Sequence, residues 1–279
     1  MRDDPRHGTF RDAHEDLDAS RHAPDSPQAR SPAYRLAFAD ADFLLRDELR
    51  PVRLQLELLK PELELDARGI TSTVVLFGGA RVPRPGEEGQ NDKLSGLSHY
   101  YEEARKFARA ITERSVETNC TENVIVTGGG PGVMEAGNLG ASEAGGCSIG
   151  LNIVLPHEQV PNEYVTPELC FNFHYFGIRK MHFLLRANAI AVFPGGFGTL
   201  DELFESLTLI QTGRMQQVPV LLFGETFWRE IVNWDALAEA GTIARADLDL
   251  FRFVETAEDA LAVIDGWTLT GKRGEIPGR

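Results

Sequence analysis

The chain has 279 residues, of which 42% are hydrophobic, so it is long enough for one large α/β domain or two small ones with a sizeable core. Its formal net charge of −14 at pH 7 argues against a general nucleic-acid binder, because such a protein needs a basic face toward the phosphates. The charge does not exclude a small anionic ligand, since a few cations and backbone N–H groups can set the potential inside one cleft.

The cysteines and the hydropathy pattern indicate the compartment. Cys120, Cys147 and Cys170 form no CxxC pair and have no histidine at zinc-ligand spacing. We therefore expect these cysteines to be reduced, small core residues that bind no metal. No segment reaches the length of a membrane span, and the N-terminus lacks the apolar stretch of a secretion signal. We therefore expect a cytoplasmic protein with no membrane partner.

The first part of the chain predicts little packed structure. Residues 1–31 are rich in Asp, Arg, Pro and Ser, so they cannot offset the entropy cost of ordering, and we expect a flexible tail. In residues 32–68 apolar residues recur but are interrupted by Pro51 and Pro61. This pattern predicts one or two accessory helices, broken or kinked at the prolines, that pack on the main domain or a partner subunit.

From Thr71 onward, short apolar runs alternate with helix-length segments. Such runs indicate a parallel sheet covered on both faces, so residues 69–267 are predicted to form a Rossmann-like, doubly wound α/β domain, with a C-terminal tail at 268–279. The predicted strands are 72–79, 123–130, 147–155, 189–196, 218–225 and 251–255. The predicted helices are 98–117, 132–145, 176–188, 199–212, 226–239 and 256–265.

Three predicted strands end in glycine-rich turns, FGGA (77–80), TGGG (127–130) and PGGFGT (194–199). In a parallel sheet these turns share the carboxyl edge, where ligands bind. Glycine lets the backbone approach a ligand, and the helix after each turn offers unpaired N–H groups, a combination that suits phosphate. One such turn is equally typical of a plain strand-to-helix connection, but three on one edge favour a ligand. The long loop 80–98 lies where a lid over that ligand would lie.

Two common nucleotide motifs are absent from these turns. Val133 stands where GxGxxG needs its last glycine, and no Gly-Lys-Ser/Thr follows any turn. A dinucleotide site and a Walker site are therefore not favoured.

Glu202 has two alternative interpretations. Thr199 and Glu202 have the spacing of a capping box, in which both side chains bond backbone N–H groups at the helix start. Alternatively, Glu202 lies on the first turn after a phosphate cradle and faces the sugar of a bound nucleoside monophosphate.

The segment before the third turn carries an Arg-Lys pair. Ile178, Met181 and Leu185 lie on one helical stripe, which predicts that this stripe is buried and that Arg179 and Lys180 lie off it. Such a pair is usually solvated, but a binding role for Arg179 stays open because the next strand delivers the third glycine turn.

The chain resembles the LONELY GUY (LOG) family in three motifs, GGGPGVMEA, FGIRKMHF and PGGFGTLDELFE, over about residues 70 to 265. These proteins are cytokinin riboside 5′-monophosphate phosphoribohydrolases, many once labelled lysine decarboxylases, and the chain is most similar to the longer bacterial form. The resemblance implies hydrolysis of the N-glycosidic bond of AMP or an N6-modified AMP, giving free base and ribose 5-phosphate without a cofactor. It also implies a homodimer or higher homo-oligomer.

The same resemblance assigns the site. The catalytic residues are Arg179 and Glu202, and Lys180 lies beside the nucleotide. The other substrate-binding residues lie in the second and third glycine turns and are Gly129, Gly130, Gly132, Glu135, Gly195, Gly196, Gly198 and Thr199. The first turn departs from the family pattern, because Gly79 stands in the usual serine position. The chemistry of N-glycosidic bond hydrolysis agrees with this role of Glu202, since a carboxylate near the sugar stabilises the oxocarbenium-like state and orients or deprotonates water.

Two other functions are weighed against this one. Proteins resembling molybdenum cofactor carriers use the same fold to hold a phosphorylated pterin without turnover, but the complete PGGxGTxxE motif with the Arg-Lys pair weighs against that function. Lysine decarboxylation needs a lysine for a pyridoxal phosphate Schiff base, and Lys180 is the only lysine within the cleft motifs. The nucleotide hydrolase is therefore the favoured prediction.

Overall fold

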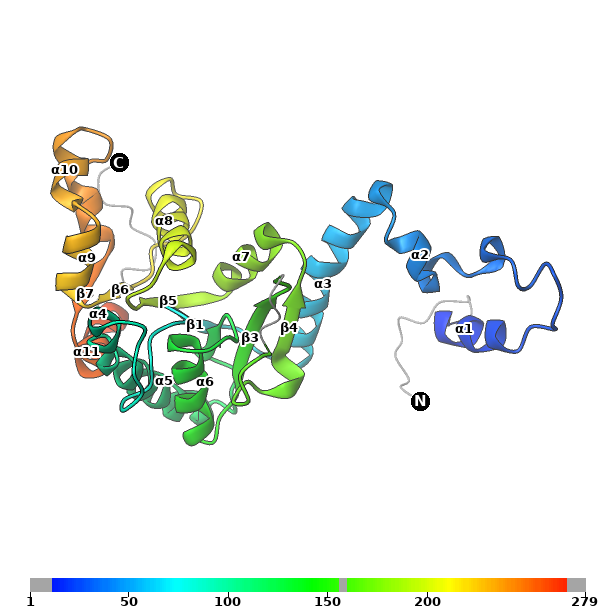
Figure 1. The fold of residues 1–279 in the computed structure, drawn as a ribbon, viewed down its shortest axis with the longest axis horizontal. Helices are drawn as coiled ribbons and strands as arrows, with labels where there is room; N and C mark the ends of the chain where they lie inside the picture. The colour runs from blue at the N-terminus through cyan, green and yellow to red at the C-terminus, as the bar shows by residue number, and fades with distance from the viewer. Residues whose placement is uncertain (1–11, 156–159, 270–279) are drawn as a thin grey trace. The chain divides into compact units, whose positions relative to one another are not determined.

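A single sheet of parallel strands organises the computed structural model, which describes residues 12–155 and 160–269 (Figure 1). The strand order is β4-β3-β2-β1-β5-β6-β7, and every neighbouring pair is parallel. The strands are β1 (Thr73–Phe77), β2 (Val124–Thr127), β3 (Ser148–Ile153), β4 (Cys170–Phe173), β5 (Ala187–Val192), β6 (Val220–Phe223) and β7 (Arg252–Val254). The order reverses between β1 and β5, which makes the carboxyl end of β1 a switch point of the kind that binds ligands.

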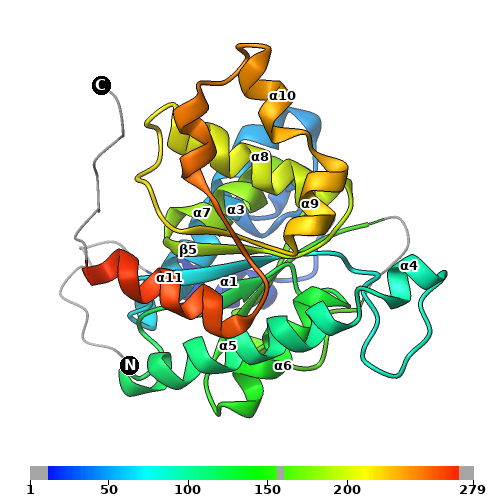
Figure 2. The same ribbon diagram turned by 90° about the vertical axis from the view of Figure 1, so that its left-hand side faces the viewer.

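Helices cover both faces of the sheet (Figure 2), which confirms the predicted doubly wound α/β class. One face carries α5 (His99–Glu117), α6 (Val133–Glu143) and α11 (Ala257–Leu269), and the other carries α7 (Phe176–Leu185), α8 (Phe197–Gln211), α9 (Glu225–Ile231) and α10 (Trp234–Glu239). Each face has its own apolar core, with Leu76 and Phe107 in the first, and Phe183 and Trp228 in the second. The shorter helical elements are α4 (Asp92–Ser95), η4 (Pro167–Leu169) and η5 (Arg245–Leu250).

In the sheet domain, one strand and one helix differ in kind from the sequence prediction. Strand β4 was missed because it is a short edge strand with alternating burial, where Asn172 is exposed, and not a continuous apolar run. The single helix predicted at 226–239 is two helices, because Val232 is extended and the Asn233 side chain accepts a hydrogen bond from the Ala236 N–H and so starts α10.

The chain divides into two compact units, Met1–Glu57 and Leu58–Arg279. The described part of the first unit holds α1 (Ala13–Arg21), α2 (Ala41–Leu44), the start of α3 (Arg50–Ala67) and three short 3₁₀ helices, η1 (Pro32–Tyr34), η2 (Ala37–Ala39) and η3 (Asp47–Leu49). The segment predicted as a tail at 1–31 therefore includes a helix, although α1 buries none of its residues. The tail predicted at 268–279 lies outside the described residues from 270 onward.

Helix α3 runs through both prolines, so this segment holds one continuous long helix and is not broken at either proline. Pro51 lies in the first turn, where its missing N–H would have no helical partner. Pro61 removes one internal hydrogen bond, but Pro61 and Leu65 are buried, and this packing helps to offset the loss.

Candidate active site

The three glycine turns meet at the carboxyl edge of the sheet, as predicted. The N–H of Gly79 donates to the carbonyl of Pro194 at 3.0 Å, and the N–H of Val133 donates to the carbonyl of Gly79 at 3.2 Å. A Cβ on Gly79 would lie 3.3 Å from the Cα of Gly195, and a Cβ on Gly132 would overlap the Gly79 carbonyl. Backbone packs against backbone here, so these positions leave no room for a side chain.

The second glycine turn is held by a buried polar network that the sequence analysis missed. The Thr127 hydroxyl donates to Asn138 Oδ1 at 2.7 Å and accepts the N–H of Gly129 at 3.0 Å. Asn162 Nδ2 lies 2.9 Å from Asn138 Oδ1 and 3.0 Å from the carbonyl of Gly130, to both of which it donates. The available sequence signal was a threonine that ends an apolar strand and an asparagine within the following apolar helix.

We expect Asn138→Ala to lower the free energy of unfolding by about 2–4 kcal/mol, because it leaves buried polar groups of Thr127 and Ser148 without their partner. Urea denaturation measures the loss. The matched control is Asn172→Ala on the edge strand, where the exposed side chain should cost no more than about 0.5 kcal/mol. Equal losses for the two variants would show that the network does not hold the turn.

The third glycine turn leads into α8 earlier than predicted. The helix begins at Phe197 with Gly196 as its N-cap, no side chain caps it, and Thr199 is already buried within the first turn. Of the two interpretations of Glu202, the capping box is therefore wrong, because Gly196 is the N-cap and Thr199 is already the third residue of the helix. Glu202 instead contacts Arg179. A Cβ on Gly196 or Gly198 would meet nothing within 4 Å, so there is open space for an anion at this helix N-terminus.

Arg179 and Glu202 form a buried ion pair between α7 and α8. Arg179 Nη1 lies 3.4 Å from Glu202 Oε1, and the two side chains are only 10% and 15% exposed. Arg179 Nε donates to the carbonyl of Leu151 at 2.7 Å, and the guanidinium lies 5.0 Å from the ring centroid of Phe183. A Cβ on Gly128 would lie 2.7 Å from Arg179 Nη2, so the second glycine turn adjoins the pair.

The stripe predicted to be buried on α7 was wrong. Met181 is 48% exposed and Leu185 is 46% exposed, whereas α7 buries Arg179, His182 and Phe183. Apolar periodicity failed because the buried face includes an arginine whose charge is matched by a carboxylate on another helix.

Burial gives Glu202 an unusual pKa. Loss of solvation raises the pKa of Glu202 to about 7, although the charge of Arg179 opposes the rise. Burial also lowers the pKa of Arg179, and Glu202 opposes that change. A carboxyl group with a pKa near neutrality exchanges its proton easily at that pH, which suits acid–base chemistry.

Lys180 joins the same two helices on the outer side of the pair. Its Nζ lies 2.9 Å from Asp201 Oδ2 and 3.0 Å from Glu205 Oε2. Burial alone would lower the pKa of Lys180, but hydrogen bonds to the two carboxylates outweigh it, so the pKa is raised. The amine is therefore held protonated.

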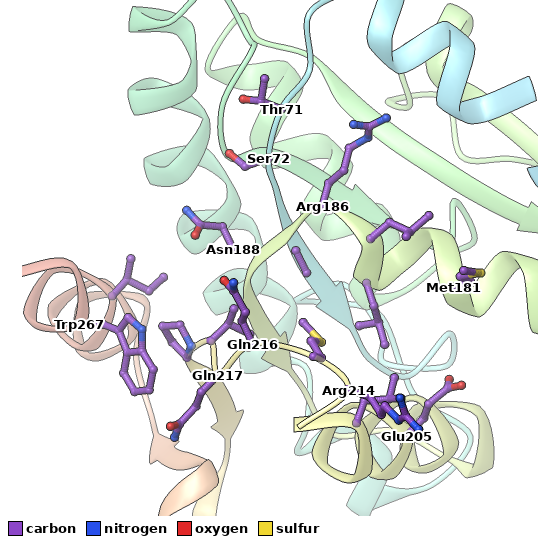
Figure 3. Close-up of a pocket in the computed structure, with 18 of the residues that line it drawn as sticks. Thr71, Ser72, Met181, Arg186, Asn188, Glu205, Arg214, Gln216, Gln217 and Trp267 are labelled. Carbon is purple, nitrogen blue, oxygen red and sulfur yellow. The ribbon is translucent and has the colours of Figure 1, made fainter. Parts of the chain in front are cut away.

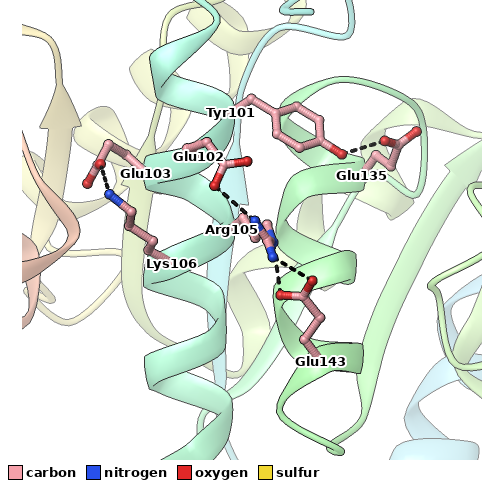
Figure 4. A network of polar contacts seen from close by, with 7 residues as sticks. All are labelled: Tyr101, Glu102, Glu103, Arg105, Lys106, Glu135 and Glu143. Carbon is pink, nitrogen blue, oxygen red and sulfur yellow. Dashed lines mark hydrogen bonds and ion pairs between the residues drawn. The ribbon is translucent and has the colours of Figure 1, made fainter. Parts of the chain in front are cut away.

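Loop 80–98 forms one wall of a pocket of about 420 Å³ beside Gly132. Glu135 of α6 also lines this pocket, and its Oε1 accepts the Tyr101 hydroxyl at 2.6 Å (Figure 4) and Arg84 Nε at 2.7 Å. Glu135, predicted to bind substrate, is thus in contact with the loop and with α5.

A second pocket, of about 880 Å³, lies at the opposite edge of the sheet (Figure 3). Its lining includes residues at the amino ends of strands, such as Ser72 and Asn188, together with Trp267 of α11. Neither the glycine turns nor the Arg179–Glu202 pair lines it. The predicted site residues lie at the carboxyl edge, where the pocket beside Gly132 is smaller, at about 420 Å³.

Within 12–155 and 160–269, no group of three or more His, Cys, Asp or Glu side chains is placed to hold a metal ion. No helix in the same ranges combines the length and apolar character needed to cross a bilayer.

The fold and site define a Rossmann-like α/β protein with three glycine turns at one edge of the sheet and a buried Arg–Glu pair beside them. A family model described as "Possible lysine decarboxylase" matches residues 134–264. The bifunctional cytokinin biosynthesis protein of Fusarium pseudograminearum is 32% identical over 83 residues, which is 29% of this chain and only 17% of that protein. Both matches agree with the resemblance of the three sequence motifs to the LONELY GUY (LOG) family.

Solved structures of similar proteins are more distant in sequence. The X-ray structure of TM1055, a structural genomics target, is 20% identical over 70% of this chain and 99% of its own, with a TM-score of 0.48. The molybdenum cofactor binding protein of Rippkaea orientalis is 18% identical over 71% of this chain and 98% of its own, also with a TM-score of 0.48. Identities and scores this low carry no argument about function.

Proposed function

We propose that the protein hydrolyses the N-glycosidic bond of a nucleoside 5′-monophosphate, AMP or an N6-modified AMP, to free base and ribose 5-phosphate. The observation that carries the proposal is the buried Arg179–Glu202 pair, with a carboxyl pKa of about 7, next to an open helix N-terminus.

The phosphate binds at the start of α8. The open space at Gly196 and Gly198 lets a phosphate approach the first-turn N–H groups, and the helix dipole adds partial positive charge there. Each N–H to phosphate bond is charge-assisted, so this cradle fixes the substrate in position.

Glu202 then lies within reach of the ribose. It is four residues beyond Gly198, or about 6 Å along the helix axis. As a carboxylate it stabilises the positive charge that builds at C1′ and takes a proton from the attacking water. The water oxygen bonds to C1′, and the electrons of the C1′–N bond leave with the base, which takes up a proton.

Arg179 holds this carboxylate in place. Its hydrogen bond to the Leu151 carbonyl fixes the guanidinium, and its charge favours the ionised form of Glu202. A lysine decarboxylase is not favoured, because a Schiff base needs a deprotonated lysine and Lys180 is held charged by two carboxylates.

A panel of nucleoside 5′-monophosphates, assayed by chromatography for base and ribose 5-phosphate, tests the proposal. We expect both products from AMP in equal amounts. Absence of base release from every member, with a phosphorylated pterin bound to the purified protein, would instead support the cofactor-carrier alternative.

We also propose a homodimer or larger homo-oligomer. Large apolar side chains on α7 are exposed, with Phe176 at 53%, Met181 at 48% and Leu185 at 46%, and a second copy would cover them. Light scattering should give a multiple of the single-chain mass of 30.8 kDa, and a value equal to that mass would contradict the proposal.

A further inference from the structure

Arg84 and Glu135 connect loop 80–98 to the start of α6. Arg84 Nε and Nη2 each lie 2.7 Å from Glu135 Oε1, and the Glu135 side chain is only 16% exposed. The same oxygen accepts the hydroxyl of Tyr101, a residue that is 2% exposed on α5. A loop residue is thus anchored to two helices through one carboxylate.

These contacts link the segment that follows the first glycine turn to the start of α6. Gly79 lies five residues before Arg84, and Gly132 lies three residues before Glu135. The two glycines are already in backbone contact, because the Val133 N–H donates to the Gly79 carbonyl. The first glycine turn is therefore held in two ways. The backbone hydrogen bond from Val133 holds it against α6, and the Arg84–Glu135 ion pair holds the loop that follows it.

Glu135 also poses an electrostatic problem for an anion-binding edge. It lies in the first turn of α6, where the helix dipole attracts negative charge, and an uncompensated carboxylate there would repel a phosphate dianion. The contact with Arg84 compensates this charge. Glu87 and Glu88 line the same pocket, and Arg81 is the other cation in its lining, so loss of Arg84 would leave three carboxylates with one arginine at this rim.

We propose that Arg84, Glu135 and Tyr101 form a latch that positions the first glycine turn, which packs against the third turn that holds the phosphate, and that cancels the charge of Glu135 at the rim of the cleft. This inference rests on the proposed function. The three side chains act through the backbone of residues 79–80 and 132, so they are positioning residues, and their loss affects substrate affinity more than the chemical step. This role for Glu135 differs from the substrate contact that the family resemblance implies.

The test variant is Arg84→Gln. We expect KM for AMP to rise about tenfold with kcat within about threefold, because the bond-breaking pair is untouched while the cradle loosens and the rim becomes more negative. Adding Glu135→Gln to Arg84→Gln should recover only the part of the affinity lost to the uncompensated carboxylate, and the loop should stay released because the latch is still absent.

The matched control is Arg105→Gln. Arg105 joins the same two helices through Glu143, with Nε and Nη2 on the two carboxylate oxygens at 2.9 and 2.7 Å (Figure 4). Its loss removes an equivalent ion pair away from the glycine turns, so KM should stay within about twofold of the wild type. An equal rise in KM for both variants would reduce the latch to a general packing contact.

Two readouts are independent of turnover. Calorimetry with ribose 5-phosphate should show the same loss of affinity in Arg84→Gln, and trypsin should cleave after Lys93 several times faster because the loop is released. If AMP is not hydrolysed at all, these two measurements still show whether the latch positions the loop and the glycine turn. Unchanged ribose 5-phosphate affinity together with unchanged cleavage in Arg84→Gln would overturn it.

Discussion

Glu202→Gln is expected to lower kcat/KM for AMP by about 10²–10⁴-fold and to leave the fold intact. Glutamine keeps the size of the side chain and still accepts a hydrogen bond from Arg179, but it cannot take up a proton or carry the negative charge that an oxocarbenium-like state requires. Initial rates of base release measure the effect, and circular dichroism reports the fold.

The control for this variant is Glu205→Gln. Glu205 lies on the same helix, three residues further on, and pairs with Lys180 at the outer side of the site. We expect kcat/KM of Glu205→Gln to stay within about fivefold of the wild type, because a partly exposed ion pair such as Lys180–Glu205 contributes little free energy. If Glu202→Gln behaved like Glu205→Gln, the carboxylate of Glu202 would be structural only.

The raised pKa of Glu202 also predicts a pH dependence. The ionised form acts as the base, so kcat/KM should rise between pH 6 and pH 8 with an apparent pKa of about 7, and Glu202→Gln should lack this step.

The free energy of unfolding should change with pH in the opposite direction. Between the ordinary value of 4.5 and about 7 the folded protein retains a proton that the unfolded chain loses, so stability falls as pH rises through 7. Urea denaturation at pH 5 and pH 8, with wild type and Glu202→Gln, measures this difference.

Gly132→Ala is expected to cost about 3–5 kcal/mol of stability and to disrupt the edge that binds the nucleotide. Gly132 has φ of +68°, and a Cβ there would overlap the carbonyl of Gly79 and lie 2.8 Å from the carbonyl carbon of Ala80. Backbone atoms cannot rotate away as a side chain can, so the first and second glycine turns must separate.

Gly145→Ala isolates the conformational part of this cost. Gly145 has a similar φ of +72°, but a Cβ there would meet nothing within 4 Å, so we expect a loss of only about 1 kcal/mol. Urea denaturation compares the two variants. A Gly132→Ala loss no larger than that of Gly145→Ala would contradict the close backbone packing at this edge.

The parts of the fold that could be predicted from the sequence are those with local signals. Continuous apolar runs located five of the strands, the short segment 251–255 gave a sixth, and the glycines after β1, β2 and β5 located the carboxyl edge, because these signals arise within a few neighbouring residues. Strand β4 lacked that signal, since it is short and Asn172 faces solvent.

The parts that could not be predicted depend on contacts between distant residues. The buried face of α7 is decided by Arg179, whose charge is matched by Glu202, 23 residues later in the chain. The network that holds the second glycine turn joins Thr127, Asn138 and Asn162 from a strand, a helix and a loop. Polar residues become buried only where such partners exist, and periodicity within one helix does not reveal them.

The most direct test of the proposed chemistry is the release of adenine and ribose 5-phosphate from AMP, measured side by side for the wild type and Glu202→Gln at pH 8. We expect equal amounts of the two products from the wild type and a loss of at least about 100-fold in the variant. Two results would contradict the assignment of the buried Arg179–Glu202 pair as the catalytic centre. One is product release at similar rates from the wild type and the variant, and the other is no release from the wild type.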